Sequence, residues 1–463
     1  MTHYLDLPYL SLGHAALLIG ILVSLPSFHR KSPRRTALLC LLAAVICFAL
    51  ALWRVMQNAS AELLDPWLPC LEADALDGVP LLLYPVIAAL GICVAPRRDV
   101  KGYALSGILL LVFGTEMVYA SANIIALNVG WWITCLPFVC GAFGQTLDRK
   151  LTSLALITSA ALLTAASMFF HSASIHDMSS IPLVSLVLLL LAVVVRKGLF
   201  PLHQWSLRLF EHGPLIPAAL LFNAHLGALL VARSESNHLP PMAHQVLDWL
   251  CLLALLTALV TSLRGLVVKK PRRMLAFVCI SQASFILAGL SASNTAGVMG
   301  GMLHWMVVSF ASTGLIAILR ILEVRVVDVA DPNESLGLAV RAPRLATFFL
   351  ICGLALVGLP GTMGYCAEDL LFHGAQERHP VMGVALLLAT ALNAINLLRL
   401  YSVLFLGVLP KNVIEIPDAL PRERWPLALI VCFLITGGIF PSLPVALRKA
   451  ATEHFLFEAK HHE

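Results

Sequence analysis

The sequence predicts an all-α protein that crosses a membrane about fourteen times. Of its 463 residues, 59% are hydrophobic and 12% are charged, whereas about 25% of the residues in a soluble globular protein are charged. So few charges cannot cover the surface of a soluble protein of this size. Disorder is excluded because it requires low hydrophobicity and high charge. The net charge of +5 is small, and the basic residues lie in short loops, which gives no support for nucleic-acid binding.

Apolar stretches follow one another along the chain, and about 20 apolar residues are needed for each span. No basic segment precedes the first stretch, so we expect a retained span there and not a cleaved signal. The polar connections are short, which leaves no room for a large soluble domain. The expected spans are 9–26, 36–54, 78–95, 103–121, 123–144, 151–170, 180–210, 213–233, 245–267, 273–291, 297–322, 344–373, 380–408 and 425–446.

Two of these stretches, 180–210 and 344–373, are too long for one simple crossing at about 1.5 Å per residue. Each contains helix breakers near its middle. Broken helices at membrane depth are tolerated where protein or water satisfies the freed backbone groups, and in transporters they point to the transport path. The breakers are Gly198 and Pro201 in the first stretch, and Gly358, Pro360, Gly361 and Gly364 in the second.

The charges of the loops predict the topology. If every stretch crosses once, the basic segments 29–35, 96–101 and 268–273 share one side, and the acidic loop 55–77 lies on the other. By the positive-inside rule the basic side is cytoplasmic, so both termini are expected outside.

Several ionisable residues lie inside apolar stretches, where each charge costs about 3 kcal/mol or more. Lys197 immediately precedes the first break, and Glu368 and Asp369 follow the second. Arg196 and Lys197 have an alternative role as anchors that snorkel to a membrane surface. The two carboxylates have an alternative role as a helix N-cap pair.

Glu116 stands alone in an apolar stretch without a basic neighbour in sequence, so it needs a spatial partner or must stay neutral. Five histidines also fall in apolar elements: His14, His203, His225, His304 and His373. One such histidine is usually a hydrogen-bonded structural residue. Several histidines together with a lysine and carboxylates suit a proton relay, because imidazole changes charge near neutral pH.

No cofactor signature is found. The 11 cysteines contain no CxxC pair and the histidines no HxxxH spacing, so no metal site is expected. There is no GxGxxG fingerprint and no Walker loop. We expect no cofactor in this chain.

The segment 196–233 resembles a signature of the proton-translocating, antiporter-like membrane subunits. That family includes the large membrane-arm subunits of complex I, the Mrp cation/proton antiporters and the membrane subunit of the DAB inorganic-carbon uptake complexes. Its pattern of a lysine, a break, P-x-H/Q-x-W and G-P is matched here by Lys197, Pro201, His203, Trp205, Gly213 and Pro214. Further matching stretches are 272–277, 358–369 and 399–407.

The resemblance implies two inverted five-helix repeats, each with a broken helix. It carries Lys197 over as the central lysine, Glu368 as its counterpart in the second half, and His304 as a histidine of an H-A-x-x-K-A motif. The implied organisation is N-terminal helices in 1–100, a first repeat in 101–233, a second repeat in 234–408, and a last helix with its tail in 409–463.

The sequence departs from the family pattern at three positions. Val308 stands where the family has a lysine, Ile133 where relatives carry a glutamate, and Asn223 at a common histidine position. Glu116 is a candidate to replace the missing partner of Lys197, or is unrelated to it. The proton-translocation residues that we expect are Lys197, Glu368, Glu116, His203, His225, His304 and Asp369.

The resemblance implies an ion-translocating subunit of the bacterial cytoplasmic (inner) membrane, without enzymatic activity of its own. The loss of core charges favours a DAB-type subunit, in which a proton or sodium gradient drives a soluble cytoplasmic partner. That partner is expected to resemble carbonic anhydrase and to hold zinc. The alternatives are a redox-driven pump subunit of complex I or a membrane hydrogenase, and a cation/proton antiporter subunit. The mixed-charge loops 206–213 and 323–343 are the expected docking surface.

Overall fold

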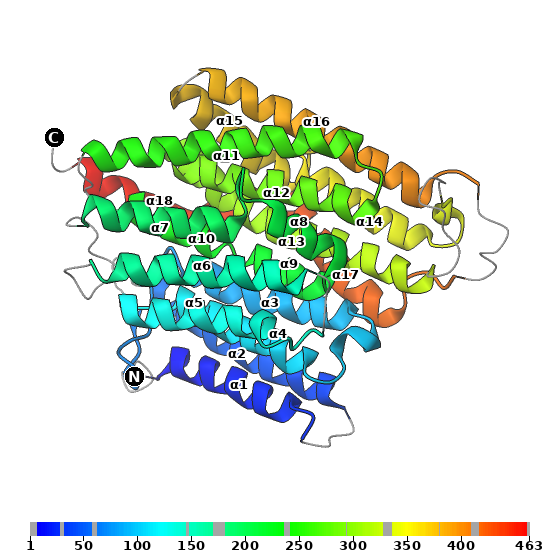
Figure 1. The fold of residues 1–463 in the computed structure, drawn as a ribbon, viewed down its shortest axis with the longest axis horizontal. Helices are drawn as coiled ribbons and strands as arrows, with labels where there is room; N and C mark the ends of the chain where they lie inside the picture. The colour runs from blue at the N-terminus through cyan, green and yellow to red at the C-terminus, as the bar shows by residue number, and fades with distance from the viewer. Residues whose placement is uncertain are drawn as a thin grey trace.

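Each apolar stretch expected to cross the membrane is helical in the computed structural model (Figure 1). The described residues are 7–27, 32–57, 63–144, 148–169, 181–235, 241–292, 294–326, 336–378, 380–408 and 416–460. An all-α membrane architecture is therefore confirmed. Loop residues 327–335 and 409–415, and parts of 29–35, 55–77 and 145–150, lie outside the described residues.

The helices of the first half of the chain are α1 (Tyr9–Ser24), α2 (Pro33–Gln57), α3 (Gly78–Val94), α4 (Ala104–Tyr119), α5 (Ile124–Val139), α6 (Arg149–Ser167), α7 (Leu183–Lys197), α8 (Gln204–His212), α9 (Leu215–Asn223) and α10 (Leu226–Glu235). Those of the second half are α11 (Pro241–Val267), α12 (Pro271–Leu290), α13 (Thr295–Arg325), α14 (Pro343–Leu356), α15 (Met363–Arg378), α16 (Pro380–Phe405), α17 (Pro421–Ile439) and α18 (Ser442–Lys460). The short elements are the antiparallel strands β1 (Leu63–Leu64) and β2 (Glu72–Ala73) and the 3-10 helices η1 (Arg97–Val100) and η2 (Leu338–Val340).

By length and apolar composition, seven helical segments of the described part can each cross a membrane, with α9 and α10 together forming one of them. The number of spans is eight if the bent pair α17–α18 is counted as a further one. Five further apolar helices are shorter, at 10–17 residues. The spans expected at 180–210 and 344–373 are each divided between two helices. The number of fourteen crossings stays a prediction.

Both predicted helix breaks are present. α7 ends at Gly198 and α14 ends before Gly358, and these glycines have left-handed backbone φ angles of +63° and +71°. Glycine adopts this conformation without the strain that a Cβ atom introduces. At the first break the carbonyl of Val195 accepts a hydrogen bond of 3.1 Å from the backbone N–H of Gly198 and a second one, of 2.9 Å, from the indole of Trp205.

A third break, between α9 and α10, was not predicted from the sequence. His225 has a φ of +47° there, which interrupts the helix although the two short helices together form one span of 20 residues, Leu215–Ser234. Two tyrosines from other helices satisfy carbonyls at this break. Tyr84 donates to the carbonyl of Leu220 at 3.0 Å, and Tyr119 donates to that of Ala224. This break has no proline or glycine between the two helices, so the usual sequence signal is missing.

The two ends of the bundle differ in charge. We call the end where α1 begins and loop 63–77 lies the terminal face, and the opposite end the basic face (Figure 1). On the basic face Arg320 binds Asp99 at 2.6 and 2.7 Å, and both Arg320 and Arg272 pair with Glu323. The segments 96–101 and 268–273 therefore share one face, as predicted, and some of their charges are already paired within the chain.

Close helix contacts in the second half depend on glycines. Gly374 of α15 lies against the backbone of α13, and a Cβ atom placed there would be 2.3 Å from the amide nitrogen of Gly297. Small residues that let backbones approach are the usual means of helix association in membranes. Gly353 of α14 is different, because a Cβ atom there would meet nothing nearer than 3.7 Å.

We expect Gly374→Ala to lower the thermal unfolding midpoint in detergent, because α15 and α13 must separate to admit the methyl group. Gly353→Ala is the matched control. It should leave the midpoint unchanged or raise it, since alanine is favoured over glycine in a helix by about 1 kcal/mol. Equal midpoints for the two variants would contradict the packing described.

Candidate functional site

The two cations at the end of α7 are buried. Arg196 and Lys197 are each 5% exposed, which excludes the role of snorkelling surface anchors. Lys197 Nζ contacts Nδ1 of His225 at the break between α9 and α10. Arg196 turns to α5 instead, where it donates a 2.7 Å hydrogen bond to Thr134 Oγ1 and lies over the ring of Trp131. Arg196 and Lys197 are adjacent in sequence, but Arg196 contacts α5 whereas Lys197 contacts the α9–α10 break.

The backbone of α10 approaches Lys197 closely. A Cβ atom on Gly227 would lie 2.7 Å from Val193 Cγ1 and 3.3 Å from Lys197 Cγ. The glycine lets α10 pack on α7 at this level. Its sequence neighbour His225 is thereby held beside the ammonium group.

Polar contacts continue from Lys197 into the second half of the chain. The imidazole of His225 lies edge-on to Trp305 on α13, with 5.9 Å between ring centroids, and is within electrostatic range of His304. His304 Nε2 donates a 2.9 Å hydrogen bond to Gln282 Oε1 on α12. His304 and Gln282 are fully buried, and His225 is nearly so.

Glu368 lies at the far end of this series, directly at the second helix break. Its Oε2 would be 2.5 Å from a Cβ atom on Gly358, so the left-handed glycine also makes room for the carboxylate. Gln282 and Thr390 are its neighbouring hydrogen-bonding side chains. Glu368 Oε1, Gln282 Nε2 and Thr390 Oγ1 nevertheless have no direct hydrogen-bond partner. Buried polar atoms of this kind are typically satisfied by internal water.

We call the series Lys197, His225, His304, Gln282 and Glu368 the polar axis. Lys197 contacts His225, and His304 is hydrogen-bonded to Gln282, whereas among the described residues no direct hydrogen bond links His225 to His304 or Gln282 to Glu368. Two of its members are histidines, and one is a lysine beside an imidazole. Such an arrangement can load, pass and release a proton. Gln282 and Thr390 were missed from sequence, because amides and hydroxyls are common in helices and carry no charge signal.

Asp369 does not belong to the axis. Its side chain is 49% exposed and lies 3.6 Å from Nδ1 of the exposed His373. Our expectation of an N-cap role is wrong, because α15 begins at Met363 and Asp369 is in its second turn. The adjacent Glu368 faces inward because neighbouring residues on a helix point about 100° apart.

Glu116 is fully buried in α4 but is not the partner of Lys197. Neither of its carboxylate oxygens has a hydrogen-bond partner in the described part of the chain. The residue lies within electrostatic range of Tyr84 and Tyr119, and its backbone is beside the imidazole of His14. The proposed replacement of the family glutamate by Glu116 is therefore corrected.

His203 also lies off the axis. Its Nε2 is 3.4 Å from Arg264 of α11, and its backbone carbonyl accepts a hydrogen bond from Ser206. It lies beyond the first break on the way to the basic face. The described contacts of His203 therefore do not include Lys197.

The three family departures have structural consequences. Ile133 packs against Gly114 of α4, and Val308 is a buried apolar residue of α13. Asn223 donates to the Ser309 carbonyl at 3.2 Å and to Thr313 Oγ1 at 2.8 Å, which ties the α9–α10 break to α13. The described residues contain no cluster of His, Cys, Asp and Glu that could hold a metal ion.

Comparisons with known proteins agree with this architecture. The family model described as NADH:quinone oxidoreductase/Mrp antiporter, TM matches residues 107–393. One relative, NADH-quinone oxidoreductase subunit N of Halorhodospira halophila, is 27% identical over 58% of this chain and 57% of its own. The chain thus spans just over half the length of that relative.

Two solved structures share the fold over nearly the whole chain. The Mrp complex from Dietzia sp. has a chain with a TM-score of 0.81 and 17% identity, covering 96% of this chain and 97% of its own. The archaeal membrane-bound sulfane sulfur reductase gives 0.83 and 19%, with the same coverage. The family match includes the two broken helices and all five residues of the polar axis. The chain belongs to the NADH:quinone oxidoreductase/Mrp antiporter transmembrane family.

Proposed function

We propose that the chain is a proton- or sodium-translocating membrane subunit that couples an ion gradient to a soluble partner. The observation that carries this proposal is the polar axis, which places a buried lysine and a buried carboxylate at the two helix breaks. Charges at this depth are costly and are usually retained for function. The chain itself performs no chemistry on a substrate in this account.

Inorganic carbon uptake is the use of the gradient that we favour. The axis has an imidazole, not a carboxylate, against Lys197, and an apolar valine at position 308 where relatives have a lysine. A path with fewer charges than the family pattern is what we expect of a subunit whose partner is not a quinone-reducing module. The partner would be a cytoplasmic zinc protein resembling carbonic anhydrase.

The second candidate is a redox-driven pump subunit, favoured by the relatedness to NADH-quinone oxidoreductase subunit N. Purification from membranes in mild detergent separates the two. A soluble zinc protein that co-purifies supports carbon uptake, whereas iron–sulfur and quinone-site subunits support the redox pump.

Lys197→Ala should abolish ion transport by the assembled complex, because it removes the ammonium group at the first break. The variant should still assemble, since alanine suits the last turn of α7. Flux is measured in proteoliposomes with an internal pH-sensitive dye. Full transport by the variant would exclude a carrier role for Lys197.

Glu368→Gln should impair coupling more than Asp369→Asn. The first variant neutralises a buried carboxylate at the second break, whereas Asp369 is half exposed and outside the axis. Both substitutions nearly preserve side-chain shape, so each controls for the other. Greater loss in Asp369→Asn would show that the functional carboxylate is misassigned.

Scrambling 326–338 should weaken assembly with the soluble partner more than scrambling 55–77. Residues 327–335 and 58–62 lie outside the described residues, and the expectation rests on the mixed charges of the first loop and on its place next to α13 and α14. Co-purified partner is quantified on a gel. Stronger loss from the 55–77 variant would place the partner on the terminal face.

A further inference from the structure

The last helix buries a charge that the polar axis does not use. α17 and α18 meet at a bend of 86°, and α18 then packs against α13. Its Arg448 is 1% exposed and donates a 3.0 Å hydrogen bond to the carbonyl of Leu76, but its Nε has no partner. From sequence, this residue was assigned to the tail after the last span.

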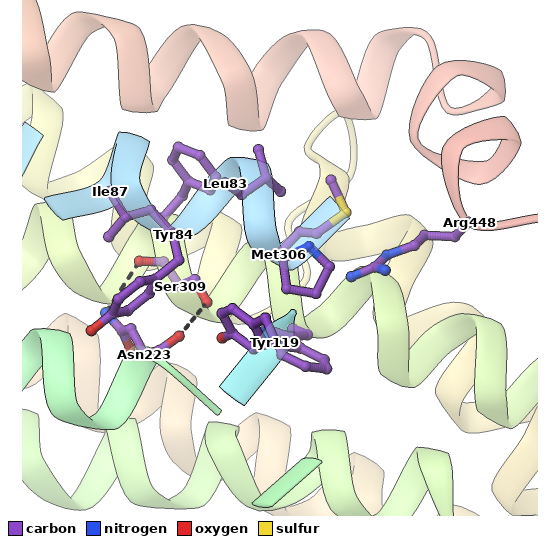
Figure 2. Close-up of a pocket in the computed structure, with 11 residues that line it drawn as sticks. Leu83, Tyr84, Ile87, Tyr119, Asn223, Met306, Ser309 and Arg448 are labelled. Atoms are coloured by element: carbon purple, nitrogen blue, oxygen red, sulfur yellow. Dashed lines mark hydrogen bonds between the residues drawn. The ribbon is translucent and has the colours of Figure 1, made fainter. Parts of the chain in front are cut away.

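Arg448 borders a small cavity between α3, α4, α9, α13 and α18, with room for about one water molecule. Figure 2 shows the guanidinium reaching in from one side, with Tyr84, Asn223 and Ser309 at the other. Tyr119, which binds the Ala224 carbonyl, lies between them. The cavity thus ends at the α9–α10 break.

Trp305 connects the cavity to the polar axis. Its ring is 5.8 Å from the guanidinium carbon of Arg448, and its centroid is 6.2 Å from that of Tyr119 and 5.9 Å from that of His225. On the other side, Arg448 lies within electrostatic range of Asp74 in the loop before α3. Arg448 therefore connects the loop before α3 to the cavity, and Trp305 lies between the cavity and His225.

We propose that this cavity is the access route from the terminal face to His225 and Lys197, and that Arg448 closes it to cations. This inference rests on the proposed ion-translocating function. A fixed positive charge in a narrow, poorly hydrated passage repels protons and metal cations, because electrostatic forces are strong where the dielectric constant is low. Arg448 is a positioning and selectivity residue that does not itself carry the ion.

The test measures passive proton flux into proteoliposomes containing the purified complex, under an imposed pH gradient and without other energy input. Arg448→Gln should raise the flux by about tenfold or more, because it removes the charge that closes the route. Arg448→Met, which keeps an apolar stem against Trp305, should leak as well. Arg448→Lys keeps the charge and should stay within about twofold of wild type.

A double variant identifies the route of the leak. Adding Lys197→Ala to Arg448→Gln should return passive flux to the wild-type level, because the leak passes through His225 and Lys197. Thr452→Val, one turn further along α18, is the control for a general disturbance of this helix and should not leak. Only variants that elute as the intact complex are scored.

Two results would overturn the inference. Wild-type passive proton flux with both Arg448→Gln and Arg448→Met would show that the charge of Arg448 does not block the cavity. A leak that persists in the double variant would show a route outside the polar axis. The proposed function is tested separately by Lys197→Ala alone. If that variant lost driven transport while Arg448→Gln stayed tight, the function would stand and only the gating role would fall.

Discussion

An interrupted helix inside a membrane must find partners for the backbone groups that it releases, and this requirement organises the first half of the molecule. Lipid offers no hydrogen bonds, so the partners must come from protein or enclosed water. Here backbone amides at the helix ends satisfy some of these groups, and aromatic side chains add hydrogen bonds to carbonyls beside the breaks. Trp205 binds the Val195 carbonyl, Tyr84 that of Leu220 and Tyr119 that of Ala224. Trp205 also stacks on Phe222 of α9, with 5.6 Å between the ring centroids, and Lys197 contacts His225 beside this junction.

The second break also positions a buried ionisable side chain, but here glycines and not aromatic side chains make room for it. Gly358 turns the chain and leaves space for the Glu368 carboxylate, while close glycine contacts hold α15 against α13. Between the two breaks lie buried polar side chains of α12 and α13, chiefly Gln282 and His304. Polarity is concentrated along this line, whereas Asp369 and His373 face outward on α15. Lys197 and Glu368 are thus buried at helix breaks, whereas Glu116 and Arg448 are buried within continuous helices.

Much of this architecture could be predicted from the sequence. The long apolar stretches predicted the helices, and the glycines and prolines predicted two of the breaks. The apolar run around Lys197 indicated that this residue is buried. The α9–α10 break could not be predicted, because no glycine or proline lies at Asn223–His225. The pairing of Lys197 with Glu116 was wrong because sequence separation does not reveal which way each helix face points. Arg448 was missed because it lies beyond the last apolar window, where a bent helix returns to the core.

We propose that one polar path joins the two halves of the chain. Gln282 is the residue of this path between His304 and Glu368. The most direct test is driven proton flux through Gln282→Leu, which keeps Lys197 and Glu368 but removes the amide between them. Ser284→Ala on the same helix is the control, because within the described part of the chain its hydroxyl donates to the carbonyl of Ile280 in its own helix. The account predicts flux below about one tenth of wild type for Gln282→Leu and normal flux for the control. Wild-type flux through Gln282→Leu would show that the two halves do not exchange ions along this line.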